Sequence, residues 1–137
     1  MTGVILDTGF LVALFRPDER LREAARGFLR NHRHGLLTVA PVIVETCFFL
    51  SADGKLRLLE WIERGAVAVA DVPTSAYAQM RALIRKYADR NLDFADLCIV
   101  WLAETSGCRA ILTVDERDFS AVRLAKGKRF DLIDWFG

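Results

Sequence analysis

Five acidic residues border or interrupt apolar segments of this sequence, where a buried carboxylate is costly unless its charge is compensated. They are Asp7, Glu45, Asp93, Asp96 and Asp115. Carboxylates that lie close together repel one another and raise each other's pKa. A divalent cation relieves this repulsion, and ligands that are all oxygen select Mg²⁺ or Mn²⁺ over zinc. The residue set therefore predicts a metal site, with a substrate phosphate as the typical additional ligand.

Two of these acids directly follow apolar runs that we predict to be buried strands. Asp7 comes after the run at residues 3–6, and Asp115 comes after the run at residues 110–114. In an open parallel sheet, ligands bind at the carboxyl ends of the strands. We therefore expect both carboxylates at the same edge of one sheet.

Two more acids open the predicted helix at about residues 94–105. Asp93 and Asp96 are three residues apart and share one helix face. The rest of this segment is almost entirely apolar, which predicts a helix buried on most of its surface. It directly precedes the strand that ends at Asp115, so a short connection would bring these acids to the same edge. Glu45 stands inside the apolar run VIVETCFFL, where an acid is otherwise hard to explain.

Each acid also has a purely structural interpretation. Asp93 fits the N-cap of its helix, and Asp96 then takes the third helical position, where the helix dipole favours an acid. Asp7 and Asp115 could open loops at the ends of strands. Glu45 could be exposed on a half-buried helix. Only the acids taken together indicate a site.

Short apolar runs alternate with longer amphipathic segments, which predicts an α/β domain with a mainly parallel sheet. We expect strands at residues 3–6, 36–39, 66–72 and 110–114, and an edge strand at 130–133. We expect helices at residues 8–15, 18–33, 41–50, 53–64, 73–87 and about 94–105. The β-branched start of the segment at 41–50 also allows a strand. In the helix at 53–64, we expect Leu56, Leu59 and Ile62 to face the core.

The length of 137 residues predicts one domain, residues 1–137, with a substantial core. The net charge of +1 gives no overall attraction to nucleic acid, so a binding site for it must be built from local basic patches. Three cysteines without CxxC spacing indicate core residues in a reducing compartment. No apolar run approaches a membrane span, and we expect a cytoplasmic protein. His32 and His34 are expected at the surface, not as metal ligands.

Several basic groups are candidates for an RNA path. One is the arginine stripe of the helix at 18–33, although an ordinary solvated helix face is the slightly preferred explanation of this stripe. The stripe consists of Arg22, Arg26, Arg30 and Arg33, and the other candidates are Arg16, Arg85, Lys86, Lys126, Lys128 and Arg129. Sequence alone does not rank these groups.

Four segments, in this order, resemble PIN-domain ribonucleases, in particular the toxin subunits of type II toxin–antitoxin modules. They are ILDTGFLVALF, VIVET, LDFADLCIVWLAE and ILTVDERDF. The resemblance spans almost the whole chain. It implies a three-layer α/β/α sandwich around a short, mainly parallel sheet. It also implies a Mg²⁺-dependent endoribonuclease, with Mn²⁺ as the alternative ion.

The resemblance also implies roles for single residues. The family's acidic quartet is matched by Asp7, Glu45, Asp96 and Asp115. Asp93 matches an additional acid near the metal, and Thr8 and Thr113 match small hydroxyl positions that support the site. Asp118 is expected to be structural or peripheral.

The same resemblance implies an RNA substrate, a small antitoxin protein and a homodimer as partners. The helices at 18–33 and 53–64, together with Phe48, Phe49 and Trp61, are candidate contact surfaces, although such aromatic residues usually belong to the core.

Other functions are compatible with acids at strand ends. A haloacid-dehalogenase-type phosphatase would place a second Asp two residues after Asp7, and Gly9 stands there instead. A receiver domain would pair acids after its first strand and place a lysine after its last, and neither pattern is clear. A non-catalytic binding domain would need no metal. A metal-dependent DNA nuclease also fits, because carboxylates do not read the sugar.

Overall fold

The computed structural model describes residues 3–137 of the chain. Its centre is a five-stranded sheet in the order β3-β2-β1-β4-β5, in which all neighbouring strands pair in parallel. The strands are β1 (Val4–Leu6), β2 (Leu36–Val39), β3 (Ala68–Ala70), β4 (Ala110–Leu112) and β5 (Asp131–Leu132). The α-helices are α1 (Thr8–Phe15), α2 (Arg22–Asn31), α3 (Ala40–Phe48), α4 (Ala52–Glu63), α5 (Tyr77–Lys86), α6 (Phe94–Ser106) and α7 (Glu116–Ala121). Two short 3₁₀ helices are η1 (Thr74–Ala76) and η2 (Ala125–Gly127).

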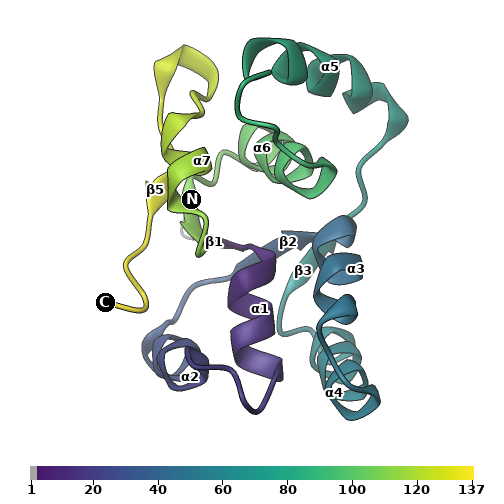
Figure 1. The fold of residues 1–137 in the computed structure, drawn as a ribbon, viewed down its shortest axis with the longest axis vertical. Helices are drawn as coiled ribbons and strands as arrows, with labels where there is room; N and C mark the ends of the chain where they lie inside the picture. Colours follow the sequence, from purple (N-terminus) through teal and green to yellow (C-terminus); the bar gives the residue numbers. More distant parts are fainter. Residues whose placement is uncertain (1–2) are drawn as a thin grey trace.

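The helices form layers on both sides of the sheet (Figure 1). Helices α1, α2 and α4 lie on one side of it, and α5 and α6 lie on the other. Helix α3 contacts both α1 and α6. The predicted three-layer α/β/α sandwich with a parallel sheet is confirmed.

Helix α6 is the most buried helix of the core, as its composition predicted. Eight of its residues are buried, in an unbroken run from Ala95 to Val100 and again at Leu102 and Ala103. It ends at Gly107, whose φ of 76° is in the left-handed region that favours glycine at a helix C-terminus. This burial fixes the position and direction of the helix, and therefore of the acids at its start.

Several predicted boundaries need correction. The helix predicted at 18–33 begins at Arg22, because the chain turns at residues 17–21 after Pro17. The strands predicted at 66–72 and 110–114 are limited to three residues each. The segment at 41–50, which allowed either a helix or a strand, is helical over α3. Helix α7 was not predicted at all.

The predicted inner face of α4 is wrong at Leu56 and Leu59, whereas Ile62 is half-buried and packs against the core as predicted. Leu58 is fully buried, whereas Leu56 is 68% exposed and Leu59 is 52% exposed. Gly54 explains this rotation, because a Cβ at this position would stand 3.2 Å from both Phe15 O and Leu50 Cβ. The helix approaches the core along the side that carries Gly54 and Leu58, which are four residues apart. A glycine does not register as an apolar residue in a hydrophobic pattern, so the pattern placed Leu56 and Leu59 inward instead of Leu58.

Candidate functional site

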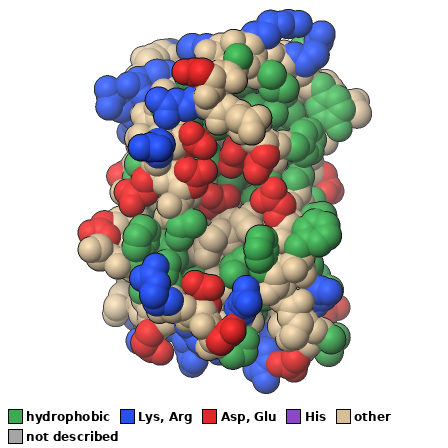
Figure 2. Space-filling model, viewed as in Figure 1, with side chains coloured by type: hydrophobic (Ala, Val, Ile, Leu, Met, Phe, Trp, Pro, Cys, Tyr) green, Lys and Arg blue, Asp and Glu red, His purple; other side chains and the backbone are tan. Residues whose placement is uncertain are grey.

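The sheet order brings two of the predicted acids to one edge. Strands β1 and β4 are direct neighbours, and both point toward this edge because they are parallel. Asp7 follows β1 directly and caps α1, and Asp115 follows β4 and precedes α7. Figure 2 shows acidic side chains gathered across the middle of one face of the molecule. The topology therefore builds the acidic centre that the sequence predicted.

The tightest acidic group consists of Asp96, Asp115 and Asp118, whose nearest carboxylate oxygens all lie within 4.8 Å of one another. The structure thus places Asp118 within the centre, although the sequence analysis expected it to be structural or peripheral. The signal that could have found it is its spacing from Asp115. Two acids three residues apart at a helix start share a face, as Asp93 and Asp96 do. This signal was missed because α7 was not predicted.

Asp7 is held in a defined orientation by two hydrogen bonds. Thr113 Oγ1 donates to Asp7 Oδ2 over 2.7 Å, and Thr8 N donates to Asp7 Oδ1 over 2.8 Å. The same Thr113 Oγ1 accepts a hydrogen bond from Asp115 N at 2.9 Å. Thr113 therefore links Asp7 to the backbone of Asp115. In turn, Trp135 Nε1 donates to Thr113 O over 3.1 Å and ties this link to the core.

Burial raises the pKa of Asp7 to about 6, and the hydrogen bond from Thr113 opposes this shift. The side chain is only 7% exposed. The negative charges of Glu45 and Asp115 raise the pKa further. Asp7 therefore behaves as a carboxylate that lacks a compensating positive charge.

Asp93 and Asp96 form a reciprocal capping box at the start of α6. Asp96 N donates to Asp93 Oδ1 over 2.9 Å, and Asp93 N donates to Asp96 Oδ2 over 3.1 Å. The capping interpretation is confirmed for both residues. It does not account for the pKa of Asp96, which is raised to about 8 by burial and then by the charge of Asp93. Each side chain also keeps one oxygen that the cap does not use.

Glu45 reaches the centre from α3. Thr8 Oγ1 donates a hydrogen bond of 2.8 Å to Glu45 Oε1, which joins α3 to the first turn of α1. Burial raises the pKa of Glu45, and Asp93 raises it further. The hydroxyl residues Thr8 and Thr113 therefore both bind a quartet carboxylate in the structure.

The donor set fits a hard divalent cation. Three carboxylate oxygens converge, and burial together with mutual repulsion raises the pKa of Asp7, Asp96 and Asp115. Within residues 3–137, the one ion pair that reaches the three-acid group joins Arg90 Nη1 to Asp118 Oδ1 at 3.9 Å. Oxygen-only ligands with uncompensated negative charge are the donor chemistry of Mg²⁺ and Mn²⁺ sites.

The histidines and cysteines lie outside the acidic group. His34 is exposed, as predicted, but His32 is half-buried and stacks on Phe28. Cys98 and Cys108 are buried as predicted, and Cys47 is half-buried.

Of the predicted arginine stripe, Arg26, Arg30 and Arg33 are exposed and Arg22 is half-buried, and Arg33 lies beyond the end of α2. Arg30 pairs with Glu23 at 3.2 Å, and both side chains are well exposed.

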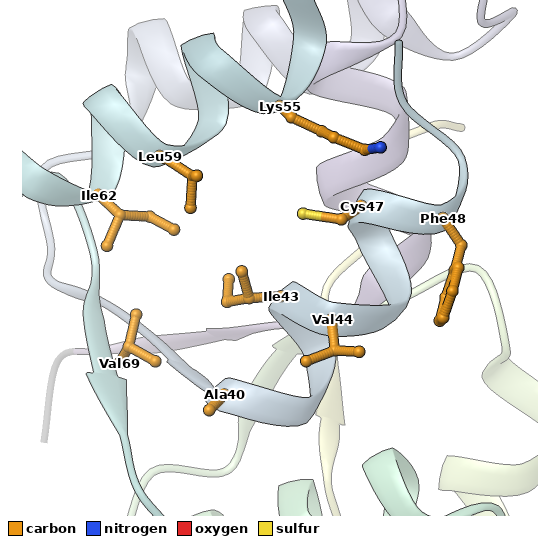
Figure 3. A pocket seen from close by; sticks show the side chains of 9 residues that line it. All are labelled: Ala40, Ile43, Val44, Cys47, Phe48, Lys55, Leu59, Ile62 and Val69. Carbon is orange, nitrogen blue, oxygen red and sulfur yellow. The ribbon is translucent and has the colours of Figure 1, made fainter. Parts of the chain in front are cut away.

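An apolar groove of about 700 Å³ lies between α3, α4 and β3, away from the acidic centre (Figure 3). Its walls include Ile43, Val44, Phe48, Leu59 and Ile62. Lys55 and Cys47 are the titratable residues among its lining residues. The other lining residues of this apolar groove are all hydrophobic.

Comparisons with known proteins agree with this architecture. Residues 4–124 match the family described as the PIN domain. The chain is 32% identical over 135 residues to Ribonuclease VapC26 of Mycobacterium tuberculosis (strain H37Rv). The matched region covers 95% of this chain and 99% of that protein. It is also similar to the crystal structure of Mycobacterium tuberculosis VapC20, which is described as a sarcin-ricin loop cleaving toxin. That similarity has a TM-score of 0.73 and 17% identity, and covers 79% of this chain and 86% of the other. The second comparison supports the fold.

Proposed function

This chain belongs to the PIN-domain family, and we propose that it cleaves RNA phosphodiesters with Mg²⁺ held by its acidic centre. As a relative of the VapC ribonucleases, it is an endoribonuclease of the toxin–antitoxin class. None of the helices within residues 3–137 has the length and apolar composition needed to span a bilayer. We propose the cytoplasm as its location and residues 1–137 as one nuclease domain.

The proposed ligands of the ion are Asp7, Asp96 and Asp115, with Glu45 and Asp93 as further acids of the same centre. The proximity of Asp118 to Asp96 and Asp115 adds it to this set. When bound, the ion supplies Lewis-acid polarisation of the scissile phosphate. Thr113 and Thr8 fix the orientation of Asp7, and Thr8 also holds Glu45. The observation that carries this proposal is the convergence of three carboxylates beside a buried fourth one.

Total cellular RNA is the substrate for the first test. The purified chain is incubated with Mg²⁺ or Mn²⁺, with chelator, and as the Asp96→Asn variant, and new 5′ ends are mapped by sequencing. A parallel reaction contains single-stranded DNA. We expect discrete RNA ends that require the metal and vanish in Asp96→Asn. Cleavage of DNA alone would favour a DNA nuclease, and absence of both cleavage and Mn²⁺ binding would favour a non-catalytic domain.

We further propose that the antitoxin covers the apolar groove between α3 and α4 (Figure 3). The groove wall carries Phe48, which is 81% exposed, and exposed apolar patches commonly mark protein interfaces. The test is copurification with the small protein encoded by the adjacent gene. Leu59→Asp is expected to abolish copurification, whereas Leu56→Asp, an exposed residue of the same helix outside the groove lining, is expected to preserve it. Equal behaviour of the two variants would contradict this placement.

The homodimer is a separate proposal. Light scattering of the purified chain is expected to give twice the monomer mass of 15.4 kDa. A mass that stays monomeric at micromolar concentration would contradict it.

A further inference from the structure

A second groove, of about 410 Å³, lies beside the acidic centre and is lined in part by α1. Thr8 and Val114 line it at the end next to the centre, because Thr8 holds Glu45 and Val114 directly precedes Asp115. Arg16 and Arg20, which follow α1, line it as well. Figure 2 shows a hollow beside the acidic side chains, with hydrophobic side chains on both sides of it and basic side chains beyond. The groove thus lies next to the proposed reaction site.

The shape of this groove depends on a close contact between α1 and the segment after β4. A Cβ at Gly9 would stand 2.5 Å from Val114 Cγ2, so the absence of a side chain at this position allows Val114 to pack directly on the first turn of α1. Val114 nevertheless stays 47% exposed. One wall of the groove is therefore apolar and held in place by backbone packing.

Phe49 supplies a second apolar surface in this groove. Phe49 lines the groove and is 54% exposed. Exposed aromatic rings next to a phosphate-binding centre are typical stacking partners for unpaired bases, since every base presents a π face. An apolar patch of this kind suits a nucleobase better than a sugar or a phosphate.

The charges in the groove point to Arg20 as its phosphate contact. Arg16 is already paired with Asp18 at 3.2 Å, whereas none of the ion pairs formed within residues 3–137 includes Arg20. Glu19 also lines the groove and opposes the binding of an anion there. An arginine presents a planar fork of donors that matches a phosphate group. Arg20 is therefore the free cation beside the apolar walls.

We propose that this groove binds the RNA nucleotide next to the scissile phosphate, with Phe49 against its base and Arg20 on its phosphate. The proposal rests on the ribonuclease function proposed above and extends it to substrate positioning. It commits to single-stranded RNA, because the apolar walls suit an unstacked base and the neighbouring acidic centre is the proposed site of phosphodiester cleavage.

Fluorescence anisotropy with a labelled single-stranded RNA 12-mer of randomised sequence tests the proposal. All measurements use the Asp96→Asn chain with Mg²⁺, so that bound RNA stays uncut. We expect Arg20→Ala to weaken binding about 5- to 20-fold and to reduce the slope of log K against log salt by about 0.7, the value for one lost phosphate contact on a single strand. Arg81→Ala is the matched control, since Arg81 is an exposed arginine on α5, beyond α6 (Figure 1).

Two further variants test the base contact and the sign of the charge effect. Phe49→Ala is expected to weaken binding about 5-fold or more, and Phe49→Tyr to restore it, because both rings stack. Glu19→Gln removes the opposing charge and is expected to tighten binding about 2- to 5-fold. In the active chain, Arg20→Ala is expected to raise KM more than it lowers kcat.

The outcomes separate this proposal from the one on which it rests. If the active chain cleaves RNA while the Arg20, Phe49 and Glu19 variants all behave like Arg81→Ala, the groove proposal is wrong and the ribonuclease stands. If the active chain cleaves no RNA and the Asp96→Asn chain binds none, both proposals are wrong. If Arg20→Ala weakens RNA binding without changing the salt slope, Arg20 does not contact a phosphate and this part of the proposal is wrong.

Discussion

Helix α3 contributes side chains to two different surfaces, the acidic centre and the apolar groove. Glu45 joins the acidic centre, where several carboxylates are buried with raised pKa values. Val44 and Phe48, on the same helix, line the apolar groove with 58% and 81% of their surfaces exposed. Within residues 3–137, the three-acid group of the centre has one ion pair, from Arg90 to Asp118, and the groove lacks an apolar cover. Buried carboxylates without a cation and an exposed apolar groove are both costly in the isolated chain. A bound cation would stabilise the first surface, and a bound protein would stabilise the second.

The largest expected difference between these surfaces is in catalysis. Asp96→Asn should lower RNA cleavage by about 10³-fold, because a divalent ion contributes several kcal/mol of transition-state stabilisation. Phe48→Ala should leave cleavage within about 2-fold of the unmodified chain, because the exposed ring lies outside the centre. Rates with metal in excess, on one RNA, measure both. A comparable loss of cleavage rate in the two variants would contradict the assignment of catalysis to the acidic centre alone.

Two neighbouring leucines of α4 test the boundary between the groove and the core. Leu58→Ala should reduce the free energy of unfolding by about 2–5 kcal/mol, since this side chain is fully buried. Leu59→Ala should cost less than about 1 kcal/mol, because its side chain is 52% exposed in the groove. Urea unfolding of both variants gives the comparison. A larger loss of unfolding free energy in Leu59→Ala than in Leu58→Ala would show that Leu59 faces the core, as the hydrophobic pattern predicted.

The pH dependence of stability tests the uncompensated charge of the centre. In the unfolded chain, Asp has its ordinary pKa near 4, whereas the native pKa is raised to about 6 for Asp7 and about 8 for Asp96. The metal-free native state thus retains protons that the unfolded state has lost. Its stability should be fully present below about pH 4 and fall as pH rises toward 8, by up to about 1.4 kcal/mol per pH unit for each group.

Thermal unfolding at several pH values, with and without Mn²⁺, measures this effect. Mn²⁺ should raise the melting temperature more at pH 8 than at pH 5, because protons compete with the ion for the carboxylates. Asp96→Asn should flatten the pH profile, and Leu59→Ala should leave it unchanged. A metal-free profile that rises between pH 5 and 8 would contradict the raised pKa values.

The smallest expected effect concerns the support of Asp7. Thr113→Val keeps the shape of the side chain but removes the hydrogen bonds to Asp7 Oδ2 and Asp115 N. Loss of these bonds should cost about 1–3 kcal/mol in stability and raise the pKa of Asp7 further. The ascending limb of the pH–rate profile should then move to higher pH. Thr113→Ser keeps the hydroxyl and should restore the profile, and an unmoved profile in Thr113→Val would show that the hydroxyl does not tune Asp7.

The parts of the fold that could be predicted were those with a strong local signal. The apolar composition of α6 identified a buried helix, and the capping box of Asp93 and Asp96 could be expected from their spacing alone. The positions of Asp7 and Asp115 after apolar runs placed them at strand ends. Glu45 was noticed as an acid inside an apolar run, and the segment resemblance assigned it to the acidic quartet. Its hydrogen bond with Thr8 spans 37 positions of sequence. The inner face of α4 and the short helix α7, with Asp118, had weak local signals and were missed.

The sequence by itself therefore determined most of the segments that become strands and helices, and which acids begin or end them, because these preferences depend on residues within about one helical turn or one strand. Only the tertiary structure decided which of those ends meet. Thr113 and Asp7 are 106 positions apart, yet share a hydrogen bond because β1 pairs directly with β4. That pairing is fixed by burial on both faces of the sheet, a property of the whole core. The rotation of α4 likewise depends on tertiary contacts, because Gly54 packs closely against Phe15 and Leu50.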